Sequence, residues 1–171
     1  AGGENQFFPR LAAKKLPGFP EGLEDVKVQK AVAWRRKHER HMRQLYDGNT
    51  RVMDKRPDNF LHIGLIKAVL PSAKFIVTER DWRDVATSIY STRLGGGQNY
   101  STSLENIYHY MGQQQMLVDH WQSLLGNDLL RVRYEDLVTD PRATVGGVLE
   151  SLGEAWDERC LDFSQLRNTV Q

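Results

Sequence analysis

Apolar runs alternate with helical segments along the chain, and this pattern limits the folds that it can adopt. The run 74–79 has three consecutive apolar residues at its centre, which is typical of a strand buried on both faces. A helical segment follows at 84–91, and a second apolar run stands at 129–134. Strands separated by helices join into a parallel sheet through right-handed crossovers. The pattern predicts an α/β fold with a parallel sheet and helices on both faces.

The other expected elements follow from apolar periodicity and from residues that begin or end helices. Helices are expected over 23–46, 59–70, 84–91, 103–125 and 141–152, and strands over 51–54, 74–78 and 129–133. Ser103 and Pro141 suit the starts of helices, and Pro71 suits the end of one. A loop is expected over 92–101, which contains three consecutive glycines.

Charge and composition describe one ordinary globular domain. The 23 basic and 22 acidic side chains give a net charge of +1, so no global field favours nucleic acid or a membrane surface. No apolar stretch approaches the roughly 20 residues of a membrane span, and the first residues do not resemble a signal peptide. Cys160 is the single cysteine, so no internal disulfide is expected. These features predict a single domain over 1–171 in the cytoplasm.

Four polar residues stand at or just beyond predicted strand ends, which is where ligands gather in parallel sheets. Lys55 follows the strand expected at 51–54, and its ammonium can hold a phosphate or sulfate oxygen. Arg80 ends the next strand and Ser88 lies on the following helix, so a guanidinium and a hydroxyl together suit a terminal phosphate. Tyr134 ends the last strand and offers a ring on which a purine can stack.

Three motifs at these positions resemble the PAPS-dependent sulfotransferases. They are Arg-Asp-x-Arg-Asp-x-x-x-Ser at 80–88, Asp-Lys-x-Pro-Asp-Asn-Phe-Leu at 54–61 and Tyr-Glu-Asp-Leu at 134–137. The resemblance runs nearly end to end and is strongest to bacterial domains often joined to tetratricopeptide repeats, and more distant to the tyrosylprotein sulfotransferases. It implies a P-loop-like nucleotide fold of the nucleoside-kinase and sulfotransferase type.

The resemblance also implies roles for particular residues. PAPS would be the co-substrate, with Arg80 and Ser88 on its 3′-phosphate, Lys55 near the phosphosulfate and Tyr134 against adenine. The segment 3–11 resembles the part of the tyrosylprotein enzymes that supplies a general base, which implies Glu4 as base and Arg10 as an acceptor contact. Catalytic roles therefore fall to Glu4 and Lys55, and no metal is expected. The acceptor is a hydroxyl of a peptide tyrosine, sugar, lipid or phenol, which the residues do not distinguish.

The chain departs from the family pattern in places. The phosphosulfate loop of the type Pro-Arg-Ser-Gly-Thr-Thr has no counterpart among the 171 residues, and Trp82 replaces the usual proline. We expect the domain to be truncated at both ends, with the loop and its strand upstream. Such a piece is expected to be weakly active or inactive alone, with an open sheet position through which a second copy could associate.

Two other functions remain open from the residues. One is a nucleotide kinase-like P-loop enzyme, which would need a Mg²⁺-binding carboxylate. The other is a non-catalytic module for nucleotide or nucleic acid, built on a basic patch of Trp34, Arg35, Arg36, Lys37, Arg40 and Arg43. The neutral total charge weighs against nucleic acid as a partner. His38 and His41 lie in the same basic run and are expected to be solvated.

Overall fold

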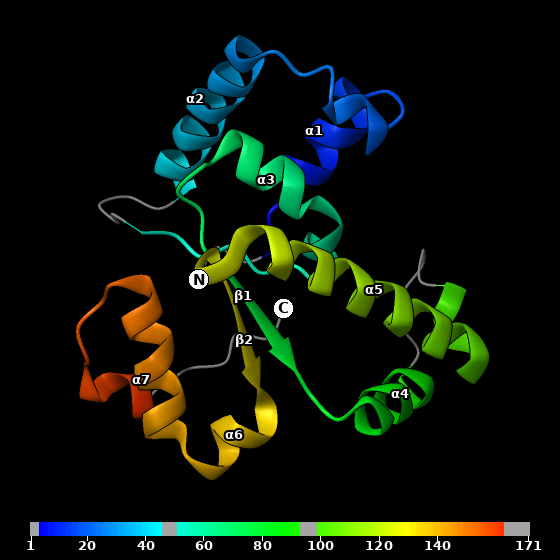
Figure 1. Cartoon of the computed structure of the whole chain (residues 1–171), viewed down its shortest axis with the longest axis vertical. Helices are drawn as coiled ribbons and strands as arrows, with labels where there is room; N and C mark the ends of the chain where they lie inside the picture. The colour runs from blue at the N-terminus through cyan, green and yellow to red at the C-terminus, as the bar shows by residue number, and fades with distance from the viewer. Residues whose placement is uncertain (1–3, 46–50, 93–98, 163–171) are drawn as a thin grey trace. The chain divides into compact units, whose positions relative to one another are not determined.

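The computed structural model of the chain describes residues 4–45, 51–92 and 99–162. The chain divides into two compact units, residues 1–73 and 74–171, which are called the N-terminal unit and the C-terminal unit. Figure 1 labels their helices and strands. The expectation of a single domain over 1–171 stays a prediction, and so does association through an open sheet position.

The N-terminal unit is helical in its described part. Its helices are α1 (Phe7–Lys15), α2 (Val28–Leu45) and α3 (Ile63–Val69), with 3₁₀ turns at Glu21–Leu23 and Asn59–His62. Helix α3 packs against both α1 and α2. Four of its seven residues are buried, namely Ile63, Leu65, Ile66 and Val69. Burial of this short helix on almost every side makes it the centre of the unit's core.

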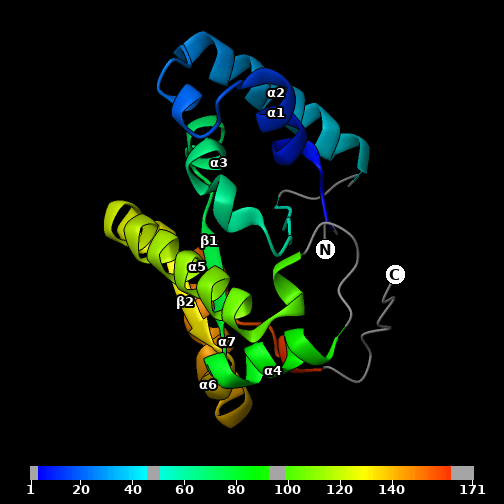
Figure 2. The same cartoon turned by 90° about the vertical axis from the view of Figure 1, so that its right-hand side faces the viewer.

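The C-terminal unit contains the sheet. Its elements are β1 (Phe75–Glu79), α4 (Trp82–Ser91), α5 (Leu104–Leu125), β2 (Leu129–Arg133), α6 (Tyr134–Thr139) and α7 (Pro141–Leu152), with 3₁₀ turns at Asn99–Thr102, Gly126–Asp128 and Glu158–Leu161. The two strands are parallel and in register from Phe75 opposite Leu129 to Glu79 opposite Arg133, and they run side by side in Figure 2. The predicted α/β fold with a parallel sheet is confirmed.

Local capping explains why several helix starts were predictable. The side chains of Asp81, Ser103 and Asp140 each accept a hydrogen bond from a backbone N–H in the first turn of α4, α5 and α7. Such caps satisfy donors that a helix start leaves without partners. Gly153, with φ of 72°, ends α7 in the left-handed region that glycine adopts without strain.

Two predictions about strands are wrong. Residues 51–54 are not a strand, and the described part of the chain forms a sheet of two strands only. Val52 and Met53 are exposed, so this segment lacks the burial and the pairing that would hold it extended. Strand β1 is not buried on both faces either, because half-buried and exposed residues alternate along it and Ile76 is 40% exposed.

The two histidines of α2 are not simply solvated. The rings of Phe7 and His38 have centroids 5.0 Å apart, and the ring of His41 stacks on Phe7 at 6.2 Å. Burial lowers the pKa of His38, and the neighbouring His41 lowers it further. The prediction failed because helix α1, which supplies Phe7, was not expected from the sequence.

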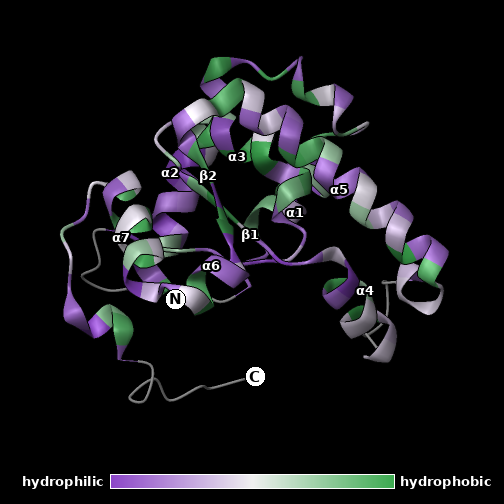
Figure 3. Cartoon of the chain, turned by 60° about the horizontal axis from the view of Figure 1, so that its bottom comes forward, coloured by the Kyte–Doolittle hydropathy of each residue, from purple (hydrophilic) through white to green (hydrophobic). Residues whose placement is uncertain are grey.

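Figure 3 shows the change in hydropathy that accompanies the end of β1, from hydrophobic residues in the strand to hydrophilic ones in the turn before α4. The turn holds Arg80 and Asp81. Within the described ranges, no helix combines the length and the apolar character that a bilayer crossing needs.

Candidate functional site

In the N-terminal unit the structure brings together two of the predicted site residues, Glu4 and Lys55. The Nζ atom of Lys55 lies 3.1 Å from Oε1 of Glu4. The two side chains are 66% and 55% exposed, so water screens the ion pair and it contributes little to stability. Glu4 can therefore leave Lys55 for another donor at small cost.

The backbone beside Glu4 is anchored through Asn5, which is buried. Its N–H donates to Oδ1 of Asp54 at 3.3 Å, and its own Oδ1 accepts from the N–H of Phe7 at 2.8 Å. The Nδ2 atom lies 3.8 Å from the sulfur of Met42 on α2. Burial raises the pKa of Asp54. These contacts fix the backbone next to Glu4, so the pairing of Glu4 with Lys55 has a structural support that sequence analysis missed.

Arg56 and Asp58 form the most enclosed ion pair of the same segment. Nε and Nη2 of Arg56 each donate to one carboxylate oxygen of Asp58, both at 2.8 Å. The Arg56 side chain is only 12% exposed, and its Nη1 is buried without a partner among the described residues. The hydrogen bond from Arg56 lowers the pKa of Asp58. The pair holds the turn that presents Lys55.

We expect Asp58→Ala to lower the free energy of unfolding by about 1–3 kcal/mol, because it leaves the buried guanidinium without its acceptor. Since the folded protein lowers the pKa of Asp58, the stabilisation is present above the ordinary aspartate range and is lost as the pH falls through the lower, folded value. Denaturant unfolding at neutral and acidic pH measures both effects. Asp25→Ala is the matched control, because Asp25 is exposed. Equal loss in the two variants at neutral pH would contradict the assignment.

In the C-terminal unit the structure brings together Arg80, from the turn that follows β1, and Tyr134, from the first turn of α6, which follows β2. The guanidinium carbon of Arg80 lies 4.9 Å from the centroid of the Tyr134 ring, which is a cation–π distance. These turns are adjacent because Glu79 is opposite Arg133 in the parallel register. Both side chains are exposed, so the pair presents a cation and an aromatic face to solvent at the carboxyl edge of the sheet.

Asp84 orients Arg80 from the first turn of α4. Its Oδ2 accepts hydrogen bonds from Nη2 of Arg80 at 2.9 Å and from Nε at 3.1 Å. Because Tyr134 and Asp84 hold the guanidinium from two sides, an anion that binds there meets a group that is already ordered. Sequence analysis did not predict a role for Asp84, although its spacing of four residues from Arg80 on a helix start was a usable signal.

Two predicted site residues are not joined to these pairs. Ser88 is exposed on α4, and among the described residues no hydrogen bond links its hydroxyl to Arg80. Arg10 is exposed on α1. The expectation that Lys55, Arg80, Ser88 and Tyr134 share one rim stays a prediction.

The basic patch on α2 is smaller than the sequence indicated. Trp34 and Arg35 are half-buried, and Nε of Arg35 donates to the carbonyl of Val69 at 3.2 Å. This bond caps the end of α3 rather than facing a ligand. Arg36, Lys37, Arg40 and Arg43 remain exposed.

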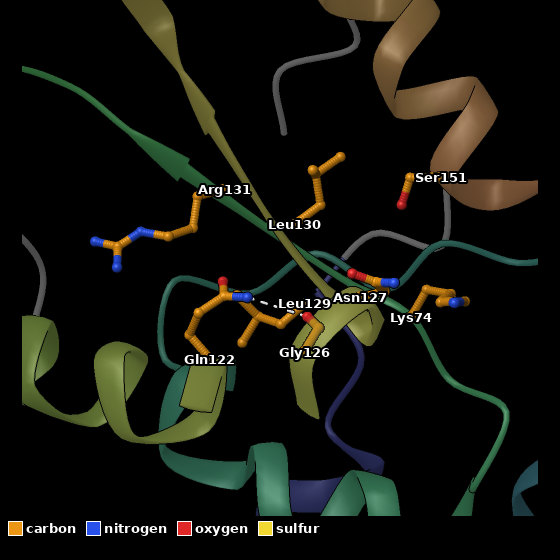
Figure 4. A pocket seen from close by; sticks show the side chains of 8 residues that line it. All are labelled: Lys74, Gln122, Gly126, Asn127, Leu129, Leu130, Arg131 and Ser151. Carbon is orange, nitrogen blue, oxygen red and sulfur yellow. Dashed lines mark hydrogen bonds between the residues drawn. The ribbon is translucent and has the colours of Figure 1, made fainter. Parts of the chain in front are cut away.

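An open hollow of about 540 Å³ lies in the C-terminal unit at the start of β2 (Figure 4). Arg80 and Tyr134 follow the other end of the two strands. Gln122 of α5 donates to the carbonyl of Gly126 at 3.0 Å beside the hollow. Both cations in its wall are already paired, Lys74 with Asp128 and Arg131 with Glu79 and Asp119. None of the predicted site residues lines the hollow. In the described ranges, no group of three or more His, Cys, Asp or Glu side chains could hold a metal ion.

Comparison with known proteins agrees with the motifs at these turns. A profile described as "Sulfotransferase family" matches residues 10–158. An uncharacterized protein of Aquifex aeolicus (strain VF5) is 28% identical over 124 residues, which are 71% of this chain and 16% of that protein. Protein-tyrosine sulfotransferase A of Caenorhabditis elegans is 28% identical over 121 residues, which are 70% of this chain and 32% of that enzyme. The chain thus spans a third or less of the length of these two relatives.

Proposed function

Because the chain belongs to the sulfotransferase family, we propose that it serves the transfer of a sulfuryl group from PAPS to an acceptor hydroxyl. PAP, which is adenosine 3′,5′-bisphosphate, is the other product. The observation that carries the proposal is the placement of Arg80 over the ring of Tyr134 at 4.9 Å, at the ends of two parallel strands. A guanidinium beside an exposed aromatic ring suits a nucleotide whose 3′-phosphate meets the cation while its base meets the ring.

The transfer needs few groups from the protein. The bond between sulfur and the bridging phosphate oxygen breaks as the acceptor oxygen attacks sulfur in line, so the phosphate leaves with the bonding electrons. Glu4 takes the acceptor proton, and Lys55 neutralises charge that grows on the bridging oxygen. Their separation of 3.1 Å supports these two roles, because both groups lie close enough to act on the same sulfuryl group. The Ser88 hydroxyl donates a hydrogen bond to the 3′-phosphate, and Arg10 contacts the acceptor.

The 3′-phosphate is the feature that separates PAPS and PAP from common adenine nucleotides. We expect Arg80→Ala to weaken PAP binding by about 1.5–3 kcal/mol, or roughly 10- to 150-fold in Kd, which is typical of a charged hydrogen bond. Binding of AMP, which lacks the 3′-phosphate, should change little. Isothermal titration calorimetry with the two nucleotides measures the difference.

Arg142→Ala is the matched control for that experiment, because Arg142 is an exposed arginine on α7 that pairs with Glu158. It should bind PAP as the unaltered protein does. If Arg80→Ala and Arg142→Ala had equal Kd values for PAP, Arg80 would not hold the 3′-phosphate. If single-stranded RNA bound and PAP did not, a nucleic-acid module would replace the sulfotransferase proposal.

A further inference from the structure

One side chain joins the two turns that carry Arg80 and Tyr134. The backbone N–H of Asp81 donates to Oε1 of Glu135 at 2.8 Å, across 54 residues of sequence. Asp81 follows Arg80 directly, and Glu135 follows Tyr134 directly. The hydrogen bond therefore fixes the peptide group next to one site residue to the side chain next to the other.

The hydrogen bond from Asp81 to Glu135 replaces one that the start of α4 could form within itself. Asp81 is the N-cap of α4, and its side chain accepts from the N–H of Arg83 at 2.9 Å. In a capping box, the third helical residue reaches back to the N–H of the N-cap. That residue is Asp84, whose carboxylate instead binds the guanidinium of Arg80. Glu135 supplies the missing acceptor from the neighbouring turn, which leaves Asp84 available to orient Arg80.

The surroundings of Glu135 keep its carboxylate ionised and in place. The hydrogen bond from Asp81 is the largest cause that lowers the pKa of Glu135. Its Oε2 is buried without a hydrogen bond in the described ranges and lies 3.7 Å from Nη2 of Arg133. The Thr139 hydroxyl donates to the backbone carbonyl of Glu135 at 2.8 Å, within α6. Through Oε1, the Glu135 side chain reaches from α6 to the backbone of the turn after β1.

We propose that Glu135 is a positioning residue, which holds the turn of Arg80 against Tyr134 and thereby sets the affinity of the site for a 3′-phosphate. The identity of the ligand rests on the proposed function, whereas the hydrogen bond between Asp81 and Glu135 does not depend on it. Without Glu135 the Asp81 N–H has no acceptor in the cap, and Asp84 is the nearest carboxylate of the same helix start that can replace it. Arg80 would then lose its partner or its place over the ring.

The test compares Glu135→Ala with Glu135→Gln, in the whole chain. Gln keeps an oxygen that accepts from Asp81, whereas Ala removes it. We expect Glu135→Ala to raise the Kd for PAP by about tenfold, as for the loss of one hydrogen bond, and to leave the Kd for AMP unchanged. Glu135→Gln should restore PAP binding to within about twofold. Asp136→Ala is the control, because it removes an exposed carboxylate from the same turn of α6.

A ligand-free readout separates this proposal from the proposed function. Hydrogen exchange of the Asp81 amide should accelerate in Glu135→Ala and stay slow in Glu135→Gln, and the Nε signal of Arg80 in NMR should lose the ring-current shift from Tyr134 only in the alanine variant. If the unaltered protein did not prefer PAP to AMP, the proposed function would fail while these NMR results could still support the geometry. Unchanged exchange and shift in Glu135→Ala, or equal losses for PAP and AMP, would overturn the positioning role.

Discussion

Glu4→Gln is expected to reduce turnover by about 10²- to 10⁴-fold, the usual contribution of a general base, while the Kd for PAP stays nearly unchanged. Glutamine keeps the shape of the side chain but cannot take a proton from the acceptor hydroxyl. The expected split follows from the proposed roles, because the base meets the acceptor and not the nucleotide. Initial rates of acceptor sulfation over a range of pH, in a protein that joins this chain to the family's phosphosulfate loop, measure it.

The anchoring of Asn5 makes that experiment informative. The buried Asn5 holds the backbone next to Glu4 through Asp54 and Phe7, so the substitution acts beside a fixed backbone position. Glu21→Gln is a matched control at an exposed glutamate of the same unit. Equal rates for Glu4→Gln and the unaltered protein across the pH range would remove Glu4 from the mechanism. The proposed sulfuryl transfer would then rest on the residues proposed to bind the nucleotide.

Leu65→Ala is expected to lower the free energy of unfolding by about 2–5 kcal/mol, the range for large-to-small changes in protein cores. Leu65 is 0% exposed and lies on α3, which packs against α1 and α2. The substitution removes buried methyl groups and leaves a cavity that a short, enclosed helix cannot easily close. Denaturant unfolding followed by far-UV circular dichroism measures the change.

Leu61→Ala is the matched control for Leu65→Ala. Leu61 is 46% exposed in the turn before α3, so its replacement should cost about 0.5 kcal/mol or less. If the two variants lost the same stability, α3 would not be the centre of the core. Other contacts of the N-terminal unit would then have to hold Glu4 and Lys55 in place.

Local signals made much of the C-terminal unit predictable. The run of apolar residues at β1, the cap at Ser103 and the proline at the start of α7 each act through a few neighbouring residues, and the structure places an element boundary at or next to each. Parallel pairing followed from the helices between the strands, because a parallel pair needs a long crossover.

Features that depend on distant contacts were not predictable. Residues 51–54 have the composition of a strand, but a strand also needs a neighbour, and sequence does not show one. Helix α1 contains Pro9 and relies on burial of Phe8 and Leu11. The ring contacts of His38 and His41 were not predicted either, because their partner Phe7 lies on α1, which was not expected.

The candidate site shows the same division. The pairing of Arg80 with Tyr134 could be expected from strand ends, because parallel strands bring their carboxyl ends to one edge. The acceptor of the Asp81 N–H could not be predicted, because the sequence does not show which carboxylate near that edge of the sheet lies within hydrogen-bond distance. Only the register of β1 with β2 selects Glu135.

Sulfuryl transfer by this chain can be followed with labelled sulfur. The chain, joined to the family's phosphosulfate loop, is incubated with sulfur-labelled PAPS and separate acceptors that carry a peptide tyrosine, a sugar hydroxyl, a lipid hydroxyl or a phenol. We expect label in at least one acceptor, with PAP released in equal amount, and a loss of both in Arg80→Ala at low PAPS. PAP binding without label in any acceptor, together with phosphorylation of an acceptor when ATP replaces PAPS, would contradict sulfuryl transfer and support a nucleotide kinase-like enzyme.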